Sequence, residues 1–429
     1  MREKQADSMI QTMIRKILSS MIVGDALGSA VDGMTKGHIR AHFRNIAGYI
    51  DPGPALKSRP ELWRKPGLYS SMTQMMLIMA MACPRRGLCA DAFGRAVAAS
   101  PEVAGYDYGI FRYPGAVERS FIQRMKNPLK HPGIPDQPCG RIIPIVSCLG
   151  LRGNSLPDQI LDVAAVIRAF TQDYPTLAAA MVYSALIRSM SAESGAAAVP
   201  IRSSIAAARE IASAIESDSA AVFAAGVNPG SLLRELRQIT DLLEETAQCD
   251  TLESAGEIII DRVNSRLKTP VTRATVNHPV ALLPYSLAIS SLAPEPLITA
   301  AFEGGAAAAL AAMTGAVSPG RIEADLEKEL VSELVNRKKI LALIDGLAEG
   351  PVPSSVLDDF IRSEASLTAK EQEELAARLK HGRKKQRKTP LTQADKEREL
   401  TRHAVESWTK LDKARWKKER RRHDKNDES

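Results

Sequence analysis

The stretch Gly24-Asp25-Ala26-Leu27-Gly28-Ser29-Ala30-Val31-Asp32 decides how this chain is interpreted. It follows a predicted amphipathic helix over residues 5–23 and sets two carboxylates among small side chains. Asp25 has two interpretations that the residues alone leave open. It is either a functional acid or a buried aspartate that accepts hydrogen bonds from backbone N–H groups at a helix end. Asp32 is the better candidate for a metal ligand, although one carboxylate seldom holds a magnesium ion.

Outward from this stretch, apolar residues recur at helical spacing and strand-type alternation is scarce, so we predict an all-α protein. From about residue 101 to 157 the chain is rich in proline and glycine, which is typical of loops that line a site. Thr368 and Glu371 have the spacing of a capping box. Predicted helices cover residues 5–23, 70–82, 90–99, 157–171, 175–191, 200–216, 230–246, 252–266, 280–292, 295–317 and 321–347, then a shorter helix to about 364, one over 368–380 and one over 392–422.

The charge of the chain is concentrated at its end. The 429 residues carry a formal net charge of +7, but residues 370–429 hold 20 Lys or Arg and 12 Asp or Glu, which leaves the first 369 residues at −1. The composition excludes disorder throughout, a collagen-like fibre and a disulfide scaffold. Five scattered cysteines and an N-terminus without an apolar signal region predict reduced thiols, a cytoplasmic location and no membrane span.

The opening stretch and four later segments together resemble the ADP-ribosylglycohydrolase family. Gly24 to Asp32 is similar to the family's G-D-A-L-G-x-x-x-E motif. Order and spacing agree over about residues 10–320. The later segments are Gly67-Leu-Tyr-Ser-Ser-Met-Thr-Gln-Met75 for G-x-W-T-D-D-T-Q-M, Gly140-Arg-Ile-Ile-Pro144 for M-R-x-x-P, Thr171-Gln172 for Thr-His, and Gly304-Gly305 with Ala306 to Ala309 for G-G-D-T-D-T.

The resemblance implies a single large orthogonal helical domain and a specific chemistry. The family builds a two-magnesium centre from the Glu of the first motif, the T-D-D-T run and the D-T-D-T run; the metals position ADP-ribose for attack by water. In this sequence Ser71 and Met72 replace the two Asp of the second motif, Ala306 to Ala309 replace the last run, and Asp32 replaces the Glu. Alanine offers no oxygen and methionine only a soft thioether, so we predict no metal and no catalytic residue.

The other candidates for a vestigial ligand-binding cleft each have an ordinary structural interpretation. Ser70, Ser71 and Thr73 could contact a ribose or a phosphate, or they could cap the helix over 70–82. Gly304 and Gly305 could let a phosphate approach a helix N-terminus, or they could serve close helix packing. The methionines of 72–81 look like core filling. We therefore predict a cleft that is partly filled.

The tail combines basic clusters with aromatic and apolar residues. Lys and Arg clusters bind phosphates and Trp stacks on bases, so the tail is predicted to contact nucleic acid or a nucleoprotein. A stripe of Leu400, Ala404, Trp408 and Leu411 would instead dock on a protein, and a solvated helix is the third alternative. The predicted binding residues are Arg383, Lys384, Lys385, Arg387, Lys388, Trp408, Arg415, Trp416, Lys417, Lys418, Arg420, Arg421 and Arg422.

Together these features predict three parts: an ADP-ribosylglycohydrolase-like body over 1–349, a hinge with short helices over 350–380, and a basic helical tail over 381–429. The predicted function is that of a catalytically inactive relative acting as a binding or assembly module, with no cofactor. The alternative is an active, divergent hydrolase that removes ADP-ribose from a modified protein or nucleic acid. That enzyme would need magnesium and would use Asp25, Asp32 and loop acids such as Asp107 or Asp173.

Overall fold

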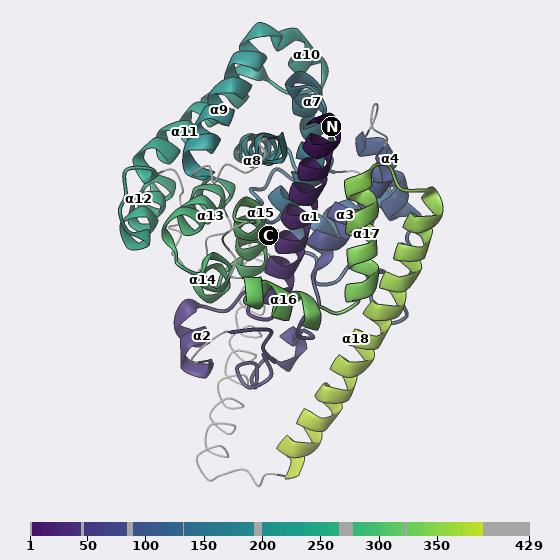
Figure 1. Cartoon of the computed structure of the whole chain (residues 1–429). Helices are drawn as coiled ribbons and strands as arrows, with labels where there is room; N and C mark the ends of the chain where they lie inside the picture. The colour runs from purple at the N-terminus through teal and green to yellow at the C-terminus, as the bar shows by residue number, and fades with distance from the viewer. Residues whose placement is uncertain are drawn as a thin grey trace, which may run out of the picture. The chain divides into compact units, whose positions relative to one another are not determined.

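Helices form wherever the apolar spacing is strongest, and the prediction of an all-α fold is confirmed (Figure 1). The computed structural model describes residues 2–43, 47–83, 89–131, 133–192, 200–265, 278–319, 321 and 324–388. Within these ranges there is no β-strand, only two isolated bridges. The α-helices are α1 (Arg2–Ser29), α2 (Lys36–His42), α3 (Ser71–Ala82), α4 (Cys89–Ala98), α5 (Ala116–Lys126), α6 (Ser147–Gly150), α7 (Leu156–Phe170), α8 (Tyr174–Ala192), α9 (Pro200–Ser217), α10 (Ser219–Ala224), α11 (Pro229–Thr246), α12 (Leu252–Asn264), α13 (Pro279–Leu292), α14 (Pro296–Glu303), α15 (Ala307–Val317), α16 (Ala324–Glu333), α17 (Arg337–Glu349) and α18 (Ser354–Lys388).

The packing of α1 against α15 is the most extensive contact between two helices of the body (Figure 1). Glycine makes it possible: a Cβ on Gly24 would lie 2.2 Å from the carbonyl oxygen of Ala311, and one on Gly28 would lie 2.3 Å from that of Ala307. On α15 the atoms that these Cβ groups would meet belong to the backbone of alanines, and every residue of the helix is buried. The first part of the opening motif, Gly24 to Ser29, therefore belongs to α1, which continues to Ser29 instead of ending near residue 23 as predicted. The rest of the motif, Ala30 to Asp32, lies in the turn after this helix.

Three predicted segments differ from the structure for local reasons. The single helix over 295–317 is two helices, because Gly304 and Gly305 adopt positive φ angles of 70° and 62° between α14 and α15. The helix over 321–347 is interrupted before α17 by Asn336 in the left-handed region. Helix α5, within the proline-rich region, is absent from the predicted helices; Gly115 is its N-cap residue, and the Glu118 carboxylate three residues later accepts the Gly115 N–H.

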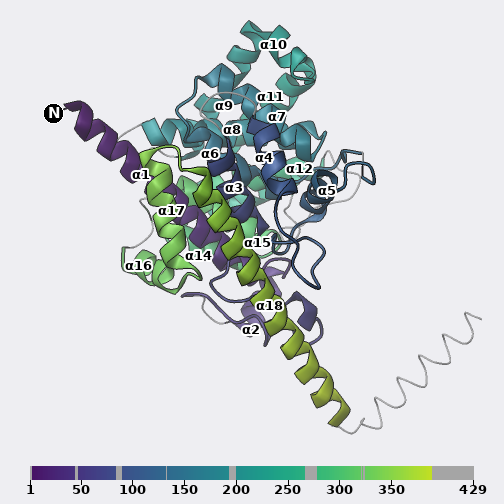
Figure 2. The ribbon, with the colours of Figure 1, turned by 90° about the vertical axis from the view of Figure 1, so that its right-hand side faces the viewer.

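Helix α18 is continuous from Ser354 to Lys388, so the predicted short helices over 350–380 are wrong. The break at GPVPSS before it is present. Thr368 caps no helix; it lies mid-helix, donates a hydrogen bond to the carbonyl of Ile110 and accepts one from Arg112. Figure 2 shows α18 passing across the body next to α3. The described residues up to Leu375 form one compact unit, and the last turns of α18, from Ala376 to Lys388, do not belong to it.

A buried acid on α18 anchors this helix to the body. The Glu364 carboxylate accepts hydrogen bonds from Tyr69 Oη (2.6 Å), Gln74 Nε2 (2.8 Å) and Arg112 Nη2 (2.7 Å). Neither Arg112 nor Glu364 is exposed at all, so each charge depends on the other for compensation. Arg112 in turn accepts, through its carbonyl oxygen, the N–H of Ser71 at the start of α3.

The structure contradicts the prediction of reduced thiols and agrees with the prediction of no membrane span. Cys83 and Cys89 form a disulfide, so the expectation of five reduced thiols is wrong; no CxxC spacing marked this pair. Cys139 and Cys148 are buried free thiols. Among the described helices none combines the length and the apolar character that crossing a bilayer requires. The cytoplasmic location stays a prediction.

We expect Gly28→Ala to destabilise the fold by about 1–3 kcal/mol, because its methyl group would collide with the Ala307 carbonyl and separate α1 from α15. Urea denaturation followed by circular dichroism measures the change. The matched control is Gly37→Ala in α2, where a Cβ meets no atom within 4 Å. A variant Gly28→Ala as stable as Gly37→Ala would contradict the close packing.

Candidate functional site

Asp25 lies inside the body and accepts hydrogen bonds from the first turn of α3. Its Oδ2 accepts from Ser70 N (3.0 Å), Ser70 Oγ (3.0 Å) and Thr73 Oγ1 (2.6 Å), as well as from Thr73 N. Its Oδ1 accepts from Ser29 Oγ (3.0 Å). Asp25 is completely buried, and five donors are more than enough to occupy its oxygens. The interpretation of Asp25 as an acceptor for N–H groups at a helix end fits this geometry.

Ser70, Ser71 and Thr73 are all buried and all engaged. Ser70 caps α3 by accepting the N–H of Met72, while Thr73 reaches Asp25. Ser71 Oγ donates to Glu118 Oε1 (2.8 Å), and the other oxygen of Glu118 accepts from Gly115 N and from Arg141 Nε (2.9 Å). These hydroxyls therefore serve the network between α1, α3 and α5.

Two guanidinium groups and a helix N-terminus surround Asp32. Its Oδ2 lies 2.7 Å from Arg141 Nη1 and 3.1 Å from Arg64 Nη1, and its Oδ1 accepts the N–H of Ala308 in the first turn of α15. The Asp32 side chain is 10% exposed, and those of Arg141 and Arg64 are 7% and 14% exposed. A second set of contacts fixes both arginines. Arg141 donates to the Tyr113 carbonyl, and Arg64 lies over the Tyr113 ring at 4.4 Å.

The two aspartates have opposite pKa shifts. Burial raises the pKa of Asp25, although hydrogen bonds from Thr73 and Ser70 and the charge of Arg141 oppose this effect. Burial acts in the same direction on Asp32, but there Arg141, Arg64 and the N–H of Ala308 outweigh it and the pKa is lowered. Asp32 is therefore a carboxylate already neutralised by protein cations.

The residues of the last motif that lie beside Asp32 offer it backbone N–H groups but no side-chain oxygen. Ala307 to Ala309 are fully buried in the first turn of α15. Gly304 and Gly305 approach the loop after α1: Gly305 N donates to the Met34 carbonyl, and Gly33 N donates to the Gly305 carbonyl. A Cβ on Gly304 would lie 2.3 Å from the Met34 oxygen. Close backbone packing therefore accounts for both glycines, here against a loop.

The residues at this site do not fit a magnesium centre. Magnesium requires about six oxygen ligands at near-octahedral geometry. Around Asp25 and Asp32 the aspartate oxygens are occupied by donors, Met72 is buried and apolar, and Ala306 to Ala309 carry no side-chain oxygen. Among the described residues no three His, Cys, Asp or Glu side chains are grouped so that they could hold a metal ion. A cation at Asp32 would have to displace Arg141 and Arg64.

The remaining predicted residues lie elsewhere. Asp173 accepts from the N–H and hydroxyl of Thr176 at the start of α8, and Asp107 is exposed in a turn. Arg383, Lys384, Lys385, Arg387 and Lys388 lie on the last turns of α18, for which the structure describes the backbone only. The tail prediction from residue 389 onward, including the stripe over 400–411, falls outside the described residues.

Sequence reasoning missed Glu118, Arg64 and Arg112, which complete the site. Glu118 follows Gly115 at the spacing of a helix-capping acid, and this signal could have located the start of α5. Arg141 was noticed only as part of a motif. Nothing in the sequence near Arg64 or Arg112 indicates partners that lie 32 and 252 residues away along the chain.

In this all-α body, Asp25 of α1 meets the N-terminus of α3, and Asp32, in the turn after α1, meets that of α15. The chain belongs to the ADP-ribosylglycohydrolase family, whose sequence model matches residues 8–355. A solved structure described as an ADP-ribosylglycohydrolase-related protein complex is 15% identical with a TM-score of 0.48, over 80% of this chain and 100% of that one. The comparison with curated proteins finds no match.

We expect Asp32→Asn to lower stability at neutral pH by about 3 kcal/mol, because Arg141 and Arg64 would lose their shared counter-charge in a mostly buried site. The folded-state pKa of Asp32 lies below its usual 3.8. Its ionised form therefore stabilises the fold above pH 3.8, and this contribution is lost as pH falls through the lowered pKa. The difference between wild type and variant should shrink below about pH 4.

Urea denaturation across pH 2.5–7 measures this difference; Asp25 is present in both proteins and its opposite dependence cancels. Asp345→Asn is the control, since Asp345 pairs with Arg15 at the surface and should contribute less than about 1 kcal/mol. A difference for Asp32→Asn that does not change with pH would show that the ion pairs are not its cause.

Proposed function

We propose that this member of the ADP-ribosylglycohydrolase family does not hydrolyse ADP-ribosyl bonds and acts as a binding or assembly module. The observation that carries the proposal is the pairing of Asp32 Oδ2 with both Arg141 and Arg64. Fixed guanidinium groups balance the carboxylate in place of bound cations. A guanidinium keeps its proton and binds no water as a ligand, so it generates no hydroxide nucleophile.

The carboxylates that remain are poorly placed for acid–base catalysis. A general base must come within hydrogen-bonding distance of the water or substrate proton that it abstracts. Asp25 is fully buried, with Ser29, Ser70 and Thr73 on its oxygens, and Glu118 is fully buried between Ser71 and Arg141. Each would have to exchange internal donors for a substrate, at the cost of leaving buried donors unpaired. This supports a scaffold role for the body.

The tail supplies the binding activity in this proposal. Its charge of +8 over residues 370–429 contrasts with −1 for the rest of the chain, and Trp408 and Trp416 alternate with lysines and arginines. Clustered Lys and Arg bind phosphates by releasing condensed counterions, and Trp adds stacking. Nucleic acid or a nucleoprotein is therefore the proposed partner, with protein docking on the Leu400, Trp408 and Leu411 face as the second possibility.

The test of inactivity is an incubation with an ADP-ribosylated protein and magnesium chloride, followed by chromatography of the released ADP-ribose. We expect no release above that of a buffer control, because the Asp32 oxygens are held by Arg141 and Arg64. Calorimetric titration with magnesium should likewise give no saturable heat. Magnesium-dependent release that disappears in Asp32→Ala would overturn the proposal and establish the divergent hydrolase.

For the tail, we expect the full chain to bind a short duplex in a salt-dependent manner and the chain lacking residues 381–429 to lose this binding. If five basic residues contact phosphates, the slope of log K against log salt is about −4.5. Fluorescence anisotropy at 50–200 mM salt measures it. Replacing Arg383, Lys384, Lys385, Arg387 and Lys388 by Gln should flatten the slope, whereas Lys338→Gln and Lys339→Gln in α17 should not. Unchanged binding after the deletion would contradict the proposal.

A further inference from the structure

Helix α18 contacts the residue that follows Arg64 in the chain. The Oε1 atom of Glu371 accepts the N–H of Lys65 at 3.0 Å, and Glu371 is 1% exposed. Arg64 itself donates to Asp32 Oδ2 at 3.1 Å and lies over the ring of Tyr113. The backbone from which Arg64 reaches Asp32 is therefore fixed by α18.

Tyr113, below the Arg64 guanidinium, has a strained backbone. Its φ is 51°, in the left-handed region that bulky side chains rarely adopt. Within the described part of the chain, Asn336 is the only other non-glycine residue with a positive φ, and its Nδ2 donates to Ser363 Oγ of α18 at 3.4 Å. Strained conformations persist only where the surrounding structure holds them. Both residues of this kind lie beside α18.

Helix α18 holds Tyr113 through two contacts. The preceding residue, Arg112, donates to Thr368 Oγ1 at 3.2 Å and to Glu364 Oε2 at 2.7 Å. Glu371 also lies close to the Tyr113 hydroxyl: burial, and after it the charge of Glu371, raises the pKa of Tyr113. Without these contacts, the backbone at Tyr113 could return to an ordinary negative φ.

The face of α18 that meets the body is largely polar. Its buried apolar residues, Phe360 and Ile361, lie in the first two turns of the helix. From there to residue 375 the buried residues are Glu364, Thr368 and Glu371. When such a surface separates, water can replace the lost hydrogen-bond partners. Contacts between parts of one chain that move relative to each other are likewise more polar than permanent ones.

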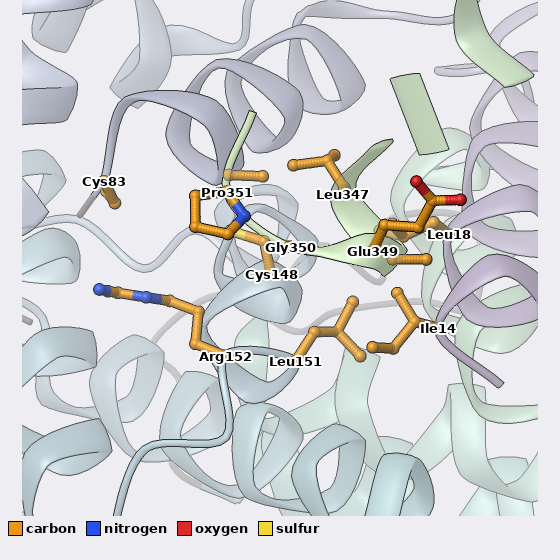
Figure 3. A pocket seen from close by; sticks show the side chains of 12 residues that line it. Ile14, Leu18, Cys83, Cys148, Leu151, Arg152, Leu347, Glu349, Gly350 and Pro351 are labelled. Atoms are coloured by element: carbon orange, nitrogen blue, oxygen red, sulfur yellow. The ribbon is translucent and has the colours of Figure 1, made fainter. Parts of the chain in front are cut away.

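The segment before α18 has space beside it. Gly350 and Pro351, which join α17 to α18, border a pocket of about 310 Å³ whose opposite wall includes Ile14 and Leu18 of α1 (Figure 3). The φ of Gly350 is 149°, a value that glycine adopts readily and other residues do not. A junction with a glycine and unfilled space on one side is suited to act as a hinge.

We propose that α18 is a strap that keeps the site at Asp32 closed. In the docked position it holds Tyr113 in the left-handed conformation and Arg64 against Asp32. On release of the strap, Tyr113 relaxes, Arg64 leaves, and Asp32 retains Arg141 alone. This inference deepens the proposed function and rests on it, because the pairing of Asp32 with Arg64 is part of the observation that supports inactivity.

The first test uses the unaltered full chain. Native-state hydrogen exchange at urea concentrations below the unfolding transition shows which amides open together. We expect the amides of Lys65 and Tyr113 to open with those of residues 360–371, at a lower urea concentration than the buried helix α15. Opening of Lys65 and Tyr113 together with α15 would overturn the strap, because the site and the core would then be one unit.

The second test removes the acceptor of the Lys65 N–H by Glu371→Ala. We expect the Tyr113 amide, which donates to Tyr106 Oη, to exchange about tenfold faster. The Nη resonances of Arg64, held apart in the wild type by its bonds to Asp32 and the Ser29 carbonyl, should merge as the guanidinium rotates freely.

Two matched variants control this test, and thermal unfolding establishes that each is folded. Glu371→Gln keeps an acceptor oxygen and should behave like the wild type. Glu374→Ala should do so too, because Glu374 contacts only the Lys65 ammonium, at the partly exposed surface. Unchanged Tyr113 exchange and Arg64 resonances in Glu371→Ala, or the same changes in Glu374→Ala, would overturn the strap.

Failure of the strap and failure of the proposed function give different results. The strap is measured by hydrogen exchange and by Arg64 resonances, without any substrate. Magnesium-dependent release of ADP-ribose by the wild type would overturn the proposed inactivity, and it would not alter which amides open together.

Discussion

The backbone contact between Gly28 of α1 and Ala307 of α15 sets the position of both aspartates in the site. Because α1 lies directly on the backbone of α15, Asp32 in the turn after α1 reaches the N–H of Ala308. About two helical turns earlier in the sequence, Asp25 faces the start of α3 and accepts the N–H groups of Ser70 and Thr73. A larger residue at position 28 would push α1 away from α15 and displace both carboxylates at once. A change in this helix packing therefore also changes the geometry of the site.

The charge balance of the site depends on which cations lie next to these carboxylates. Magnesium ions would demand several more oxygens in a partly desolvated space. Arginine instead brings its charge on a side chain that the fold already holds, with N–H groups directed at the carboxylate and at neighbouring carbonyls. Arg141 joins Asp32 to Glu118, and Glu118 joins Arg141 to Ser71. These tethered charges leave the oxygens of Asp32 and Glu118 occupied by donors of the protein itself.

Local chemistry could be predicted from the sequence, and distant partners could not. The helical spacing predicted the fold class, close packing was one of the two interpretations of Gly304 and Gly305, and a helix cap was one of the two interpretations of Ser70. By contrast, Gly304 splits a helix because it meets a loop near Met34, a contact that no local pattern encodes. Glu118 and Arg64 became site residues only through the tertiary fold. The Cys83–Cys89 disulfide lacked a recognisable spacing, and the continuity of α18 depends on burial that the capping pattern at Thr368 did not indicate.

The pairing of Arg112 with Glu364 links two points that are 252 residues apart in the chain. At 5–20 residues per second, the ribosome would need about 13–50 s to add the residues between them. During that interval the side chains of Arg112, Tyr69 and Gln74 lack the Glu364 carboxylate to which they donate hydrogen bonds in the folded protein. The acid also lies beyond residue 355, where the match to the family ends. The contact between Arg112 and Glu364 therefore forms only after a segment beyond the matched residues has been synthesised.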